Sequence, residues 1–219
     1  MSKPKSKIEI SPKGIFVYPR LTGEPDTKFN SNGVYSVKLR LSAEVGQPLV
    51  DQIDAAIEAK YQEVKAAVAA GKITFKKKGE QVNKADEPYF VDDETGDIIF
   101  NFKMNASGKR QDGTEFTQTP ALKDAKLKPL PAKICIGGGT EGKVAFTIDP
   151  FFKSNKVGVG VSLRLRAAQI IKLVEPSFNY GFEAEDGYEA NDSDDEAQND
   201  FSDENADTDD SEDVSGGDF

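Results

Sequence analysis

The sequence contains no histidine and only one cysteine, and these two shortages narrow the chemistry open to the chain. Histidine is the most common general base and the most common metal ligand in proteins. A single cysteine, Cys135, cannot form a disulfide within the chain or build a cysteine-based zinc site. We therefore expect no zinc centre, no cofactor and no Cys–His catalysis. A purely carboxylate site is the remaining catalytic option, so the composition favours a protein that is not an enzyme.

Long apolar runs are also missing. No stretch of about 18 or more apolar residues occurs, so no membrane span is expected. The basic residues 1–7 are not followed by the apolar core of a secretory signal peptide. Together with the scarcity of cysteine, these absences predict a protein of a reducing, cytoplasmic compartment.

Basic residues are absent from residues 183–219, which hold 17 of the 38 acidic residues. The rest of the chain has 21 acidic residues against all 28 basic ones, so the formal charge of −10 combines a body of +7 with a tail of −17. Such asymmetry indicates a body that binds nucleic acid and carries an acidic arm. The alternative is a tail that only improves solubility. Few apolar residues follow Pro176, so we predict a folded domain over 1–175 and a disordered acidic tail over 176–219.

Alternation of apolar and polar residues predicts at least five strands. The strand-like segments are residues 7–21, 33–41, 97–104, 133–136, 143–149 and 157–174. Residues 150–153, Pro-Phe-Phe-Lys, are expected to form a turn.

One helix is expected, over about residues 48–70, with Pro48 in its first turn and Gly71 just past its end. Apolar residues recur in it at spacings of three and four, which predicts one stripe that packs on the strands. A partner surface is the alternative. Several strands, one helix and no βαβ rhythm predict a mainly β fold, a small closed or half-closed barrel with the helix packed on it.

Residues 137–143 match the G-x-x-x-x-G-K part of a phosphate-binding loop. Val144 then stands where a hydroxyl would hold Mg²⁺, and the following residues alternate as a strand, so no helix N-terminus faces the phosphates. We expect a hairpin or barrel loop here and no nucleotide hydrolysis.

Cations occupy the polar faces of three predicted strands. If these strands are neighbours, their cations share one surface and can neutralise phosphates with release of counterions. Ordinary surface positions are the alternative. The cations are Lys38 and Arg40, then Lys103, then Arg164 and Arg166. Lys153, next to the two phenylalanines at 151 and 152, is a sixth cation expected to contact a phosphate.

Aromatic pairs stand next to Pro residues at two places. Phe151 and Phe152 follow Pro150 and precede Lys153, and Tyr89 and Phe90 follow Pro88. Adjacent residues of a strand point to opposite faces, so one ring of each pair can be exposed for bases to stack on. The alternative is an aromatic side chain buried at a corner of the fold. A basic surface with aromatics and no recognition helix favours single-strand binding without sequence preference over duplex readout.

Several short motifs occur in one order along the chain. They are Gly-Val-Tyr at 33–35, Pro-Tyr-Phe-Val-Asp at 88–92, Phe-x-Phe-Lys at 100–103, Ile-Gly-Gly-Gly at 136–139, Pro-Phe at 150–151, Val-Gly at 157–158 and the acidic ending Asp218-Phe219. In this combination the chain resembles the single-stranded DNA-binding proteins of short-tailed, T-seven-like phages. The chain departs from the family at two positions: it has Asn32 where the family has an arginine, and Lys153 where the family has a second aromatic residue.

The resemblance implies an oligonucleotide/oligosaccharide-binding (OB) barrel that binds single-stranded DNA in phage replication, recombination and repair, in the host cytoplasm. Some members of that family dimerise, so the resemblance leaves a homodimer as an option for this chain. It also implies that the tail contacts replicative DNA polymerase and primase-helicase. The DNA-facing aromatic corresponds to Phe151 and the terminal aromatic to Phe219, with Asp218 beside it.

From the residues themselves we expect the acidic tail to occupy the basic surface and compete with DNA. Two alternatives remain open: an acidic DNA mimic acting on a host nucleic-acid enzyme, and a carboxylate–metal nuclease using Asp92, Asp93 or Asp97.

Overall fold

The structure is a computed structural model that describes residues 7–75, 81–110, 112–131 and 133–176. The tail predicted over 176–219, including Asp218 and Phe219, therefore lies outside the described residues apart from its first position. Over the described ranges, no helix combines the length and the apolar character needed to cross a membrane.

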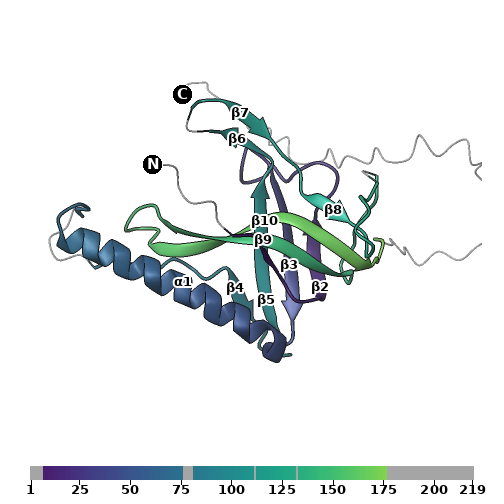
Figure 1. The fold of residues 1–219 in the computed structure, drawn as a ribbon, viewed down its shortest axis with the longest axis horizontal. Helices are drawn as coiled ribbons and strands as arrows, with labels where there is room; N and C mark the ends of the chain where they lie inside the picture. Colours follow the sequence, from purple (N-terminus) through teal and green to yellow (C-terminus); the bar gives the residue numbers. More distant parts are fainter. Residues whose placement is uncertain (1–6, 76–80, 111, 132, 177–219) are drawn as a thin grey trace, which may run out of the picture. The chain divides into compact units, whose positions relative to one another are not determined.

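In the described part of the chain, the pairing of five strands closes a barrel, as predicted; Figure 1 shows their arrangement. Antiparallel pairing joins β2 to β3, β3 to β5, β10 to β9 and β9 back to β2, while β5 and β10 pair in parallel. A five-stranded barrel of this kind is the architecture of the OB fold. The strands are β2 (Gly14–Arg20), β3 (Val34–Leu41), β5 (Ile98–Asn105), β9 (Glu141–Phe152) and β10 (Val159–Lys172).

Shorter strands extend the barrel. β1 (Glu9–Ile10) pairs with β9, β4 (Tyr89–Val91) with β5, and β8 (Ala121–Lys123) with β10. β6 (Ser107–Lys109) and β7 (Glu115–Thr117) form a separate two-stranded sheet. β6 follows directly after β5 in the chain, so this small sheet lies beyond the C-terminal end of β5, at one end of the barrel (Figure 1).

Alternate residues of the strands fill the barrel interior, most regularly in β3. In β3 the residues Tyr35, Val37 and Leu39 are buried, and their neighbours in sequence are half-buried. Phe102 of β5 and Phe146 of β9 meet across the interior with ring centroids 4.9 Å apart. The alternation read from the sequence is thus the inside–outside alternation of the barrel, and it places the polar faces of the strands outside.

The helix α1 (Ala43–Ala69) begins five residues before the predicted start, at N-cap Ser42. Pro48 therefore lies inside the helix and leaves the carbonyl of Glu44 without its intrahelical N–H donor. This is tolerated because Glu44 and Pro48 are both exposed, so water can bind that carbonyl. The predicted end is confirmed, since Gly71 follows the helix with a φ of 68°.

The first half of the apolar stripe of α1 packs on the barrel, as expected. Leu49, Val50, Ile53 and Ile57 belong to the same buried cluster as the barrel residues. The half of the helix that follows Ile57 extends beyond this cluster, alongside the ribbon formed by β9 and β10 (Figure 1).

Two local predictions are wrong. Residues 133–136 form no strand; instead the chain brings Gly137 against the end of β10, where its N–H donates to Val174 O at 2.7 Å. The predicted turn at 150–153 is strand up to Phe152, because Phe151 and Phe152 pair with β10 and the turn follows at 155–157. Pro150 is tolerated in β9 because, in the described part of the chain, β10 is its sole neighbour at this position.

Candidate nucleic-acid interface

The outer face of the barrel carries a row of aligned polar side chains across four strands. Lys103 on β5 is the partner of Ser36 on β3 and of Arg164 on β10, and Arg164 is the partner of Thr147 on β9. Directly opposed residues of neighbouring strands project to the same face. Lys103 and Arg164 therefore stand side by side on the surface, both exposed.

A groove of about 1330 Å³ lies over Lys103 and Arg164. Its floor is the outer face of β5 and β10, which adds the polar residues Asn101, Asn105 and Ser162. One wall comes from α1 and from the segment before β4, and the other borders come from β7 and from the end of β9. This hollow is the groove referred to in the rest of the text.

The groove has mixed charge with a small cationic excess. Two of its four cations are paired with acids: Lys60 with Glu63, and Arg164 with Asp149, each at 2.8 Å. Lys103 and Lys153 have no ion pair within the described residues and are exposed. The charged residues are Lys60, Lys103, Lys153 and Arg164 against Glu63, Glu87 and Asp149.

Arg164 is held in place by Asp149. The Nε of Arg164 lies 2.8 Å from Oδ2 of Asp149, and the side chain of Arg164 remains about half exposed. This contact uses one of the five N–H donors of arginine, which leaves the four on its terminal nitrogens for an anion in the groove. The other oxygen of Asp149 is buried and has no partner in the described part of the chain.

The two adjacent phenylalanines of β9 point in different directions. Phe151 lines the groove, and Nζ of Lys153 lies 5.5 Å from its ring centroid. Gly160 on β10 leaves room for this ring, since a Cβ there would lie 2.9 Å from it. The ring of Phe152 instead packs against Phe75, with centroids 6.4 Å apart.

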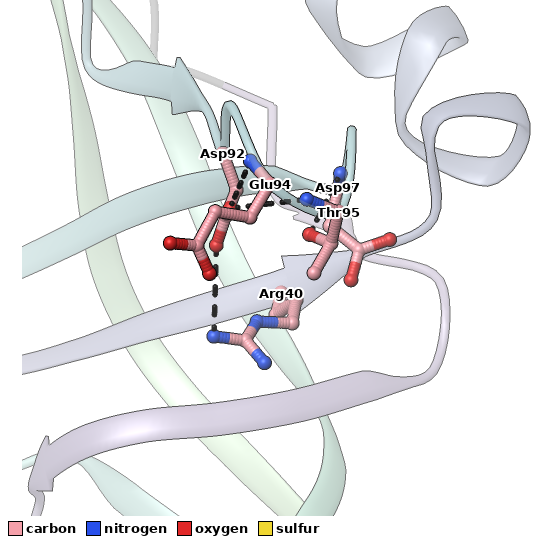
Figure 2. A network of polar contacts seen from close by, with 5 residues as sticks. All are labelled: Arg40, Asp92, Glu94, Thr95 and Asp97. Atoms are coloured by element: carbon pink, nitrogen blue, oxygen red, sulfur yellow. Dashed lines mark hydrogen bonds and ion pairs between the residues drawn. The ribbon is translucent and has the colours of Figure 1, made fainter.

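Lys38 borders the groove and Arg40 lies outside it. Lys38 is the partner of Asn101, which is part of the groove floor. Arg40 lies two residues further along β3 and faces Asp92 (Figure 2); its Nη2 is 4.0 Å from Oδ2 of Asp92. The Nε of Arg40 is buried and has no partner in the described residues.

The acidic run after β4 forms a turn. The carboxylate of Asp92 accepts hydrogen bonds from the backbone N–H groups of Glu94 and Thr95, at 3.0 and 3.3 Å, and it faces Arg40 (Figure 2). The N–H of Asp92 donates to the carbonyl of Asp97, closing the turn. Within the described ranges no three His, Cys, Asp or Glu residues are grouped so that they could hold a metal ion.

Arg166, the last of the predicted cations, is also outside the groove. It stands at a register irregularity of β10, between Leu165 and Ala167, and is half-buried. The structure thus gathers Lys103, Lys153 and Arg164 with Phe151 in the groove, places Lys38 at its border, and leaves Arg40, Arg166 and Phe152 elsewhere.

Several residues that line the groove were not predicted from the sequence. Asn101 and Asn105 alternate with Lys103 on the same face of β5, so the period of two could have identified them. Phe116 of β7 and Lys60 of α1 gave no such signal, because each comes from an element that reaches the groove only in the folded chain. Arg110 lies over the Phe116 ring, 5.4 Å from its centroid.

Polar contacts fasten the α1 wall to the segment that leads into β4. The hydroxyl of Tyr89 donates to Asp54 at 2.9 Å, and burial, together with this bond, raises the pKa of Tyr89. Lys84 donates to Glu58 at 2.9 Å. The hydrogen bonds from Gln62 and Lys84 lower the pKa of Glu58.

Comparison with known proteins gives a consistent result. Residues 18–173 match the family described as single-stranded DNA-binding protein, Bacteriophage T7, a range that contains all the groove strands from β3 to β10. The single-stranded DNA-binding protein of Enterobacteria phage T3 is 30% identical over 175 residues, which cover 74% of this chain and 71% of the relative. That of Escherichia phage T7 is 30% identical over 182 residues, covering 75% and 74%.

Solved structures share the fold. The crystal structure of gp2.5, a single-stranded DNA-binding protein encoded by Bacteriophage T7, matches with a TM-score of 0.66 and 25% identity, covering 85% of this chain and 100% of that one. The single-stranded DNA-binding protein from bacteriophage Enc34 in complex with single-stranded DNA matches with a TM-score of 0.50 and 15% identity, covering 77% and 88%.

Proposed function

Since the chain belongs to the Bacteriophage T7 family of single-stranded DNA-binding proteins, we propose that it binds a single DNA strand in the groove over β5 and β10. The observation that carries this proposal is the side-by-side placement of Lys103 and Arg164 on the groove floor, with Phe151 also lining the groove. Cations for phosphates and a ring for bases are the two elements that non-specific single-strand binding needs.

Within this proposal the cations have graded roles. Lys103, Lys153 and the terminal nitrogens of Arg164 bind phosphates in the groove, and Lys38 binds at its border. Arg40 and Arg166 lie outside the groove and act on the strand through their charge alone. Base stacking belongs to Phe151, because Phe152 is engaged with Phe75.

The binding is independent of sequence. Every base has a face that stacks on an aromatic ring, and phosphates are the same at every position. The helix α1 forms a wall of the groove and fastens to the segment before β4, so it does not serve as a recognition helix for a duplex. The protein acts by binding and not by catalysis.

The proposed biological role is coating of single strands during phage DNA replication, recombination and repair in the host cytoplasm. The acidic tail, through Asp218 and Phe219, recruits replicative DNA polymerase and primase-helicase. Its 17 acidic residues also compete with DNA for the cationic surface. As a flexible coil, about 37 residues span on the order of 30–35 Å, enough to reach across a small domain.

The test compares oligo(dT) with a duplex of the same length at two salt concentrations, using Phe151→Ala and Phe152→Ala as a matched pair. We expect Phe151→Ala to lower the affinity for oligo(dT) by about 1–3 kcal/mol, and Phe152→Ala to leave it unchanged while reducing thermal stability. Equal losses for both variants would contradict the assignment of Phe151. A chain without residues 183–219 that leaves oligo(dT) unbound at low salt would refute the function itself and favour the acidic DNA mimic.

A further inference from the structure

A second aromatic surface lies on the barrel beside the groove, where β2, β3 and β4 present their outer faces. The side chain of Tyr18 is 78% exposed and that of Phe90 is 48% exposed. The Nζ of Lys38 lies 5.8 Å from the centroid of the Tyr18 ring and 5.5 Å from that of the Phe90 ring. One ammonium group therefore lies within cation–π distance of two exposed rings. We call Tyr18, Lys38 and Phe90 the aromatic patch.

The backbone at Tyr18 is bent in a way that exposes its ring. Its φ of 47° lies in the left-handed region, which is unfavourable for a residue with a side chain, and Pro19 restricts this position further. The register between Val17 and Arg20 contains one extra residue, a bulge in β2. Bulges often redirect a side chain next to a binding site, and an unfavourable backbone that holds an exposed ring points to a use for that ring.

Phe90 is exposed because its neighbour anchors the strand. Tyr89 packs on Phe100, with ring centroids 5.8 Å apart, and donates its hydroxyl to Asp54 of α1. Phe90 projects from the other face of β4, beside Ile99 of β5. The short strand is thus held by Tyr89, and the Phe90 ring is left on the surface.

The aromatic patch adjoins the groove and has the charge that DNA requires. Lys38 is the partner of Asn101, which belongs to the groove floor, so the two surfaces meet at this pair. Arg40 follows Lys38 on the same face of β3, and the charged group facing it is Asp92 at 4.0 Å. The cationic outer face of β3 therefore continues the cationic floor of the groove.

We propose that the aromatic patch is a second stacking site, to which the DNA strand passes after leaving the groove over Asn101. Bases stack on Tyr18 and Phe90, and Lys38 binds a phosphate between them. This inference rests on the proposed function, because the strand must first occupy the groove. It makes the bound segment longer than the groove alone would hold.

The test measures the affinity for oligothymidylates of about 4 to about 16 nucleotides, the range of site sizes known for OB folds. Tyr18→Leu and Phe90→Leu should each weaken binding of the longer oligonucleotides by about fivefold or more, and leave the shortest ones unaffected. Tyr18→Phe keeps the ring and should bind as the wild type does. Thermal unfolding of each variant checks the fold, which should be little changed because both rings are exposed.

Failure of this inference is distinguishable from failure of the proposed function. If Lys103→Ala and Phe151→Ala weaken binding at every length while the two leucine variants bind like the wild type, the groove holds and the aromatic patch is overturned. If the leucine variants weaken binding of the shortest oligonucleotides as much as that of the longest, a separate second site is overturned. If the groove variants have no effect at any length, the proposed groove itself is refuted, and with it the path from groove to patch.

A fluorescent reporter gives an independent reading. The chain contains no tryptophan, so Tyr18→Trp introduces a single one at the aromatic patch. Its emission should be quenched by long oligothymidylates that stack on it and should not change with short ones that remain in the groove. An emission unaffected by the longest oligonucleotide, at concentrations that saturate the protein, would also overturn the proposal.

Discussion

Arg164→Ala is the most informative single change, because it alters both the number of phosphate contacts and the charge of the groove floor. Arg164 stands beside Lys103, with its Nε bonded to Asp149 and its side chain about half exposed. Alanine removes the terminal N–H donors and leaves the carboxylate of Asp149 in the groove without its counter-ion.

The size of the effect follows from counterion release. For single strands, the slope of log K against log salt is about −0.7 for each neutralised phosphate. Loss of one contact therefore flattens the slope by about 0.7. A fourfold rise in salt concentration should then reduce the ratio of the wild-type affinity to the variant affinity by about 2.6-fold. The affinity loss at low salt should exceed that of Lys103→Ala, because the uncovered Asp149 repels the strand.

The assay is fluorescence anisotropy of labelled oligo(dT) over a series of salt concentrations. Lys172→Ala is the matched control: Lys172 is exposed on the same strand, eight residues or about 26 Å beyond Arg164, and it does not line the groove. Adding Asp149→Asn to Arg164→Ala should recover part of the affinity without restoring the slope. An unchanged slope for Arg164→Ala would remove this residue from the interface, and equal flattening by Lys172→Ala would mean that only total charge matters.

Two further predictions address the framework and the tail. Tyr89→Phe removes the bond to Asp54 and should lower the free energy of unfolding by about 1 kcal/mol without changing DNA affinity, as denaturant titration can show. Because the fold raises the pKa of Tyr89, this stabilisation is present below pH 10 and is lost as the pH rises toward the raised value; a difference between wild type and variant that grows with alkalinity would contradict it. Deletion of residues 183–219 should tighten binding to oligo(dT) and abolish capture of replication proteins, whereas weaker binding would refute competition by the tail.

Much of the barrel could be predicted from the sequence because strand alternation is a local property. Residues 34–41 show it most clearly, because their inward or outward direction does not depend on which strand lies beside them. The inward residues include Tyr35, Val37 and Leu39, and the outward ones include Lys38 and Arg40. The helix start was missed because Pro48 is a strong local signal for a first turn, while the exposed carbonyl of Glu44 allowed the helix to begin earlier.

The candidate site was only partly predictable, because its residues meet through long-range pairing. Phe151 and Phe152 are equivalent in sequence, and the pairing of Phe151 with Gly160 decides which ring faces the groove. Asp149 gave no signal as the partner of Arg164, since the two lie on different strands. Arg166 looked equivalent to Arg164, and the irregularity in β10 places it elsewhere.

The sequence by itself determined the separation of charge between body and tail, the alternation of inward and outward residues along regular strands such as β3, and the absence of histidine and of a second cysteine. These follow from composition and from the covalent geometry of an extended chain. Only the tertiary structure decided that Lys103 and Arg164 stand side by side, that one phenylalanine of two lines the groove, and that Tyr18 and Phe90 share Lys38. Those neighbours arise when the barrel closes and brings together residues far apart in the sequence, and no local pattern records which strand lies beside which.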